Sequence, residues 1–181
     1  YAHAGNLLEA IHQVQQEDPN FEMYVMLGIW IDCKNAWTNH PNHNAENEAE
    51  NAAEVQRAVD LSLKYPEIVK ILAVGNEAMV KWAAIYFVQP NVILKYVNYL
   101  QDLKSQGKLP NDLWITSSDN FASWGGGDTI YHNADLEHLI EAVDFVSMHT
   151  YPMHDTHYNP VFWGNLEEES SETNEKKIAL A

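Results

Sequence analysis

The sequence is poor in cysteine, in basic residues and in long apolar runs. Its single cysteine, Cys33, excludes an internal disulfide bond and a zinc site built from cysteines, but it leaves the cellular compartment open. No apolar run approaches the ~18–20 residues that a membrane-spanning helix needs. The first residues, YAHAGNLLEA, lack the pattern of a signal peptide. We therefore expect a soluble chain without a membrane partner and of unknown localisation.

Charge of one sign is scarce as well, since 10 basic residues stand against 26 acidic ones and give a formal charge of −16. Such a surface repels phosphate backbones and anionic lipids, so we expect no nucleic-acid partner. A neutral ligand such as a sugar is not repelled. Most of the acidity is explained by solubility alone.

Several catalytic motifs are also missing. No G-x-S-x-G nucleophile elbow occurs, and the glycines of WGGGD (124–128) lack the lysine of a phosphate-binding loop. Two sets among the nine histidines are candidates for metal ligands, His40 with His43, and His149 with His154 and His157. Neither group has the spacing of a helical zinc motif, so we expect no metal and no cofactor.

What the sequence does contain is a regular alternation of helical and extended apolar patterns over 181 residues, a length that suits one domain. Helices are predicted around residues 7–14, 44–65, 93–103 and 135–142, and buried strands at 22–31, 68–75, 113–118, 144–149 and from 177. Asn6 and Glu9 are placed like a capping pair of the first helix. Strands that alternate with helices predict an α/β fold with about five parallel strands.

Polar and aromatic residues recur where each predicted strand ends. They include Trp30, Asp32 and Asn35, then Asn76 and Glu77, then Asp119, Asn120 and Trp124, and finally His149 and Tyr151. Chemistry in α/β sheets gathers at these carboxyl ends, where aromatic rings can stack on sugars and polar side chains can bind hydroxyls. Any one of these residues could instead cap a helix. For Glu77, which follows the apolar run of ILAVGNEAMV, a functional role is favoured. An acid against an apolar strand costs free energy unless it is used or paired.

The ordered segments VMLGIW, VGNE and DFVSMHTYP resemble glycoside hydrolase family 17, which contains β-1,3-glucanases and related glucosyltransferases, many of them secreted. The similarity runs from about residue 7 to 181. It implies a (β/α)8 TIM barrel, a β-glucan substrate and Glu77 as general acid/base. It further implies that Asn76 binds the 2-hydroxyl of the sugar and that Tyr151 orients the nucleophile. Trp30 and Asp119 are assigned to sugar subsites by position only.

The resemblance also implies a nucleophilic glutamate after a seventh strand that begins like KIALA, and the sequence stops at Ala181. We therefore expect residues 1–181 to form a single incomplete TIM-barrel domain, from about the third strand to the start of the seventh. Retaining glycosidases need two carboxyl groups about 5 Å apart, so we expect a catalytically incomplete chain. The alternative is an active hydrolase or transglucosylase whose second carboxylate is Asp119, Asp155 or a group of a partner. Open sheet edges lead us to expect a homodimer or a higher homo-oligomer.

Overall fold

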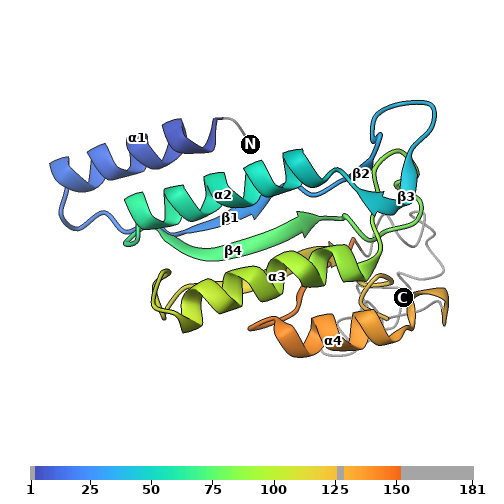
Figure 1. Ribbon diagram of the computed structural model, residues 1–181. Coiled ribbons are helices and arrows are strands. Elements are labelled where there is room, and N and C mark those ends of the chain that lie inside the picture. Colours follow the sequence, from blue (N-terminus) through green and yellow to red (C-terminus); the bar gives the residue numbers. More distant parts are fainter. Residues whose placement is uncertain (1–2, 126–128, 152–181) are drawn as a thin grey trace, which may run out of the picture. The chain divides into compact units, whose positions relative to one another are not determined.

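The computed structural model describes residues 3–125 and 129–151 and shows an α/β fold (Figure 1). Its main sheet has four strands in the order β1-β4-β5-β6, in which β1 pairs with β4, and β4 with β5, in parallel. The strands are β1 (Val25–Ile29), β4 (Val69–Asn76), β5 (Trp114–Asn120) and β6 (Ser147–His149). This confirms the predicted fold class and is consistent with part of a TIM-type barrel.

The chain divides into two compact units, Tyr1–Met148 and His149–Ala181. The first unit contains nearly all of the described residues. In the second, only His149, Thr150 and Tyr151 are described, so the strand predicted from residue 177 lies outside the described residues, as do Asp155 and His157. That residues 1–181 form one incomplete domain stays a prediction.

Helices flank the sheet and bury its apolar side chains. They are α1 (Ala4–Glu17), α2 (Glu48–Lys64), α3 (Pro90–Ser105) and α4 (Ala134–Ala142), with a short 3-10 turn, η1 (Thr129–Tyr131), before the last. Helix α2 packs on β1 and β4, and α3 packs on β4, β5 and α4. Leu72 and Ile115, neighbours in register, are fully buried under these helices. None of the helices in residues 3–125 and 129–151 is long and apolar enough to cross a membrane.

Two local predictions were wrong. Helix α1 begins at Ala4, with His3 at its N-cap, so Asn6 and Glu9 lie inside the helix and do not cap it. Glu9 instead accepts a hydrogen bond of 2.5 Å from the Tyr65 hydroxyl. The predicted helix 44–65 starts too early, because residues 42–46 form a strand, β3 (Asn42–Glu46), which pairs antiparallel with β2 (Cys33–Lys34).

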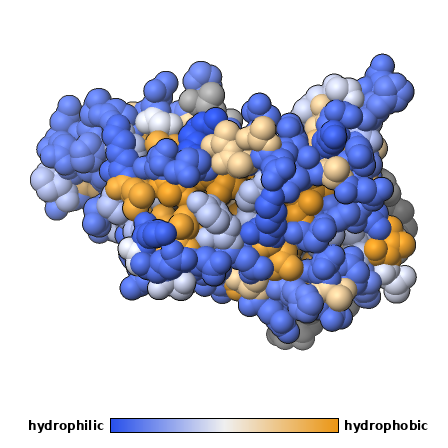
Figure 2. Space-filling view, viewed as in Figure 1, coloured by the Kyte–Doolittle hydropathy of each residue, from blue (hydrophilic) through white to orange (hydrophobic). Residues whose placement is uncertain are grey.

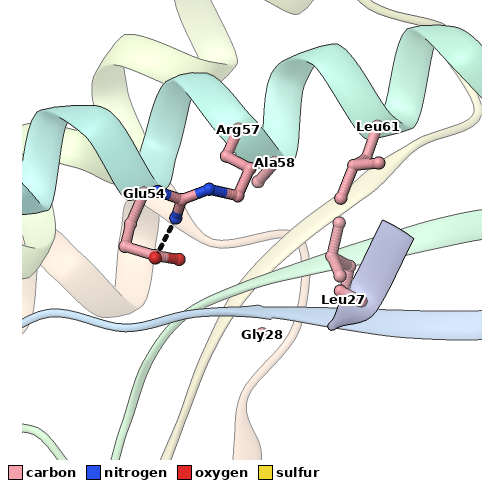
Figure 3. A pocket seen from close by; sticks show the side chains of 7 residues that line it. Leu27, Gly28, Glu54, Arg57, Ala58 and Leu61 are labelled. Carbon is pink, nitrogen blue, oxygen red and sulfur yellow. Dashed lines mark hydrogen bonds and ion pairs between the residues drawn. The ribbon is translucent and has the colours of Figure 1, made fainter. Parts of the chain in front are cut away.

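The contact between α2 and β1 shows how closely the helices cover the sheet. Leu27 of β1 faces Leu61 and Ala58 of α2, as seen in Figure 3. The cavity left there has a volume of about 10 Å³, room for roughly one water molecule. Seen from the helices, the surface is mainly hydrophilic, with apolar side chains showing in the furrows between them (Figure 2).

The opposite face of the sheet is apolar and less covered. Met26, Ile71 and Trp114 are paired in register across β1, β4 and β5, on the face away from the buried Leu27 and Leu72. Met26 is 42% exposed and Trp114 is 55% exposed. In a closed barrel this row would point to the interior, which side chains from all the strands normally fill.

Candidate active site

Strand β4 ends in a sharp turn that carries Glu77 to the rim of the sheet. Gly75 has a φ of +82°, and a Cβ atom there would lie 2.9 Å from the Cβ of Ala78 and 3.1 Å from Cδ1 of Ile93. Glu77 itself has a φ of +48°, which is uncommon for a residue with a side chain. Asn76, between them, is exposed, and Glu77 is partly buried. The backbone therefore turns left-handed twice, at positions that flank the exposed amide.

Two hydrogen bonds fix this turn to the neighbouring strand β5. The Glu77 N–H donates to the Ser118 carbonyl at 2.9 Å. The Met79 N–H donates to Oδ2 of Asp119 at 2.8 Å. Because Asn76 and Ser118 are also partners in register, the position of Glu77 is set by β5 as well as by its own strand.

Asp119 supports the turn from within the protein. Its side chain has no exposed surface, and its second oxygen accepts a hydrogen bond of 2.8 Å from the Asn120 N–H. Burial raises the pKa of Asp119 to about 6, against the opposing effect of the backbone N–H groups, and the nearby charge of Glu77 adds to the rise. The sugar contact that we predicted from its position stays a prediction, and this burial argues against it.

The raised pKa of Asp119 predicts a pH-dependent stability. Its ordinary pKa of 3.8 rises to about 6 on folding, so the folded protein binds the proton more tightly than the unfolded chain. The free energy of unfolding should therefore fall as pH rises from about 4 to 6, by roughly 3 kcal/mol from this group. In Asp119→Asn that part of the pH dependence should vanish, as measured by urea unfolding at several pH values. The same pH slope in both proteins would contradict the prediction.

Trp30 lies beside this turn and contacts two aromatic residues that the sequence analysis did not single out. It directly follows Ile29, the last residue of β1, which pairs with Val74 of β4 one residue before Gly75. Its ring centroid lies 5.1 Å from that of Tyr86 and 5.9 Å from that of Trp37. Trp37 and Tyr86 stack with a centroid distance of 5.2 Å. They follow no predicted parallel strand, although a tryptophan among the polar residues of NAWTNH could have signalled an exposed ring.

Tyr151 belongs to the second unit, His149–Ala181. It is exposed, and its ring meets that of His149 edge-on at 6.2 Å. The first unit brings together Asn76, Glu77 and Asp119, with Trp30 directly after the adjoining strand β1. The predicted role of Tyr151 stays a prediction.

Other features of the described residues lie apart from these strand ends. A groove of about 440 Å³ runs between α2 and α3, and Glu48, Lys95 and Tyr99 are among the residues that line it. It includes none of the predicted site residues. Within residues 3–125 and 129–151, no three histidine, cysteine or acidic side chains are grouped so that they could hold a metal ion.

Comparison with known proteins relates the chain to a solved structure. No family model matches the chain, and no curated protein does. Among solved structures, the chain is similar to an endo-laminarinase from Formosa Hel1_33_131, with 65% sequence identity and a TM-score of 0.86. The match covers 96% of this chain and 45% of that protein, so the chain spans less than half of its length.

Proposed function

We propose that this chain carries the proton-donor half of a glycoside hydrolase site that acts on β-1,3-glucan. The observation that carries the proposal is the turn at Glu77, an acid in a left-handed conformation at the end of β4, fixed to β5 by a backbone hydrogen bond. The 65% identity to an endo-laminarinase over 96% of the chain supports the substrate class, because laminarin is a β-1,3-glucan. Membership of family 17 belongs to the same proposal.

In this proposal Glu77 protonates the oxygen of the glycosidic bond as it breaks and later deprotonates the attacking water. The exposed Asn76 binds the hydroxyl beside the reacting carbon. Tyr151 orients the nucleophile. Each of these roles comes from the resemblance to the family, and the geometry of the turn supports the first two.

The second carboxylate of the proposed site is not identified among the described residues. Asp119 is a poor nucleophile, because it is fully buried and both of its oxygens accept backbone N–H groups. Asp155 lies outside the described residues. We therefore propose that glucan turnover requires a further carboxylate, which the resemblance places after a seventh strand, and that residues 1–181 without it bind glucan and do not cleave it.

The experiment that tests the function measures glucan binding and the release of reducing ends by the same preparation. Laminarin is the substrate, and laminari-oligosaccharides serve for calorimetry. Binding with turnover supports the enzyme, and binding without turnover supports the incomplete site. A chain that neither binds nor cleaves β-1,3-glucan would contradict both.

We also propose that a second copy of the chain covers the apolar row of Met26, Ile71 and Trp114. Exposing a few hundred Å² of such surface costs on the order of 5–10 kcal/mol, which is comparable to the stability of a whole domain. Light scattering after size-exclusion chromatography should give at least twice the 20.6 kDa of one chain. A stable, monodisperse monomer would contradict this prediction.

A further inference from the structure

Three rings at the rim form a continuous aromatic surface, which we call the aromatic platform and define as Trp30, Trp37 and Tyr86. Each ring comes from a different segment: the end of β1, the turn between β2 and β3, and the loop after β4. Trp37 is 57% exposed, and Trp30 and Tyr86 are partly buried. Trp37 thus presents a large apolar face to solvent, supported from below by two other rings.

The exposed ring is held in a costly conformation. Trp37 has a φ of +65°, which is unusual for a bulky side chain and tends to occur where function requires it. Two backbone hydrogen bonds maintain it: the Trp37 N–H donates to the Ile85 carbonyl at 3.1 Å, and the Cys33 N–H donates to the Tyr86 carbonyl at 3.0 Å. The segments that carry Trp37 and Tyr86 are therefore fixed to one another.

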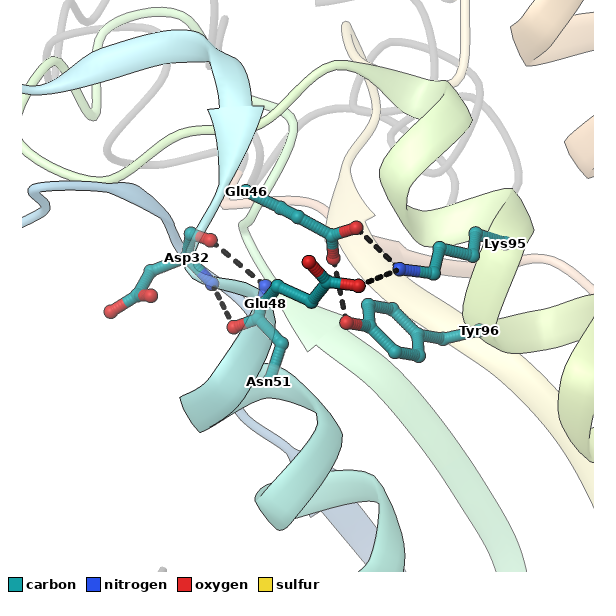
Figure 4. Close-up of polar contacts among 6 residues, drawn as sticks. All are labelled: Asp32, Glu46, Glu48, Asn51, Lys95 and Tyr96. Carbon is teal, nitrogen blue, oxygen red and sulfur yellow. Dashed lines mark hydrogen bonds and ion pairs between the residues drawn. The ribbon is translucent and has the colours of Figure 1, made fainter.

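The far end of the same hairpin is anchored to the helices, as Figure 4 shows. Glu46 of β3 accepts hydrogen bonds from Lys95 at 2.5 Å and from the Tyr96 hydroxyl at 2.6 Å. Although burial alone raises the pKa of Glu46, these bonds lower it overall, which favours the charged form that they require. A platform built on an anchored hairpin loses little conformational freedom when it binds a ligand.

Beside the platform lies a buried carboxylate, Asp32, of which one side-chain oxygen has a hydrogen-bond partner in the described part of the chain and the other has none. Asp32 is 6% exposed, and its Oδ2 accepts a hydrogen bond of 3.3 Å from the indole N–H of Trp30. Its Oδ1 is buried without a hydrogen-bond partner in the described part of the chain. The Asp32 backbone is held on both sides by the Asn51 side chain, at 3.1 and 3.0 Å. Such an oxygen requires a donor, and an ordered water that bridges to a ligand hydroxyl would supply one.

We propose that the aromatic platform and Asp32 form a binding subsite for one glucosyl unit of the chain, away from the bond that is cleaved. The apolar face of the sugar stacks on Trp37, and a hydroxyl of the same unit reaches Asp32 through water. The acidic surroundings fit a neutral polyhydroxylated ligand and disfavour an anion. Since Trp30 directly follows the pair Ile29–Val74, it lies at the same end of the sheet as Glu77, after the strand that neighbours β4. The identity of the ligand rests on the function proposed above.

Calorimetry with a β-1,3-linked glucose hexamer tests the subsite. Trp37→Ala should weaken binding roughly ten-fold, because it removes the stacked ring. Trp37→Phe should recover part of the affinity. The matched control is Tyr99→Ala, which removes an exposed aromatic ring, 43% against 57%, from the groove between α2 and α3 and should change the affinity less than about two-fold. Circular dichroism establishes that each variant is folded.

The outcomes separate the two proposals. Equal affinity in Trp37→Ala and the wild type, or an equal loss in Trp37→Ala and Tyr99→Ala, would overturn the subsite and leave the role of Glu77 intact. Weaker binding in Trp37→Ala, together with glucan turnover that does not depend on Glu77, would support the subsite and overturn the proposed chemistry. A wild-type chain that does not bind the hexamer would overturn the subsite outright.

Discussion

Glu77→Gln is expected to lower glucan turnover by about 10²- to 10⁴-fold, the usual contribution of a general acid, where the second carboxylate is present. The amide has nearly the same shape as the acid but has no proton to donate to the departing oxygen. The backbone N–H of residue 77 can still reach the Ser118 carbonyl, so binding of laminari-oligosaccharides should stay within about two-fold of the wild type. The measurement is the rate at which laminarin releases reducing ends.

The leaving group and a matched variant make this test specific. A dinitrophenyl β-glucoside needs no protonation as it departs, so the loss caused by Glu77→Gln should shrink with that substrate. Glu67→Gln is the control, because Glu67 is an exposed glutamate just before the amino end of the same strand. It should leave turnover unchanged. An equal effect of both changes, or none from either, would remove Glu77 from the chemistry.

Gly75→Ala is expected to lower the free energy of unfolding by about 2–5 kcal/mol. An alanine in the left-handed region costs roughly 1–2 kcal/mol, and overpacking a core typically costs a further ~1–3 kcal/mol. The second contribution arises because the new Cβ would lie 2.9 Å from the Cβ of Ala78 and 3.1 Å from Cδ1 of Ile93. Urea unfolding of the wild type and the variant measures the difference.

Gly107 offers a control with nearly the same backbone. Its φ is +69°, and a Cβ there would meet nothing within 4 Å. Gly107→Ala should therefore show only the backbone cost, roughly 1–2 kcal/mol. Equal losses in the two variants would mean that crowding at Gly75 is relieved by movement of Ala78 or Ile93.

The main sheet could be predicted because its buried strands are marked by runs of apolar residues that are local in the sequence. The run Ile71 to Val74 is continuously apolar, and the helical periodicity of residues 93–103 is closed by Gly107, so both elements were located within a few residues. The hairpin of β2 and β3 was missed because residues 42–46, NHNAE, have no alternating apolar pattern. Contacts between residues distant in the sequence stabilise it, among them the hydrogen bonds that Glu46 accepts from Lys95 and Tyr96 of α3.

The candidate site, too, could be predicted from the sequence only in part. Asn76 and Glu77 could be found because they directly follow a strand whose end the sequence marks with Gly75. The burial of Asp119 depends on how the end of β5 packs against residues 77–79, which no local pattern encodes. Trp37 and Tyr86 approach Trp30 only through backbone hydrogen bonds between loops, so their partnership required the three-dimensional structure.

The loop that follows Glu77 is closed at its own base, where the Val88 N–H donates to the Ala78 carbonyl at 2.8 Å. Between Met79 and Val88 the chain can vary in length and composition while the acid keeps its place, because the backbone N–H groups of Glu77 and Met79 are both bonded to residues of β5. Tyr86 lies on that loop. The proposed glucosyl subsite and the proposed proton donor can thus diverge independently, which makes residues 80–87 the segment to exchange when recognition of a different glucan is tested.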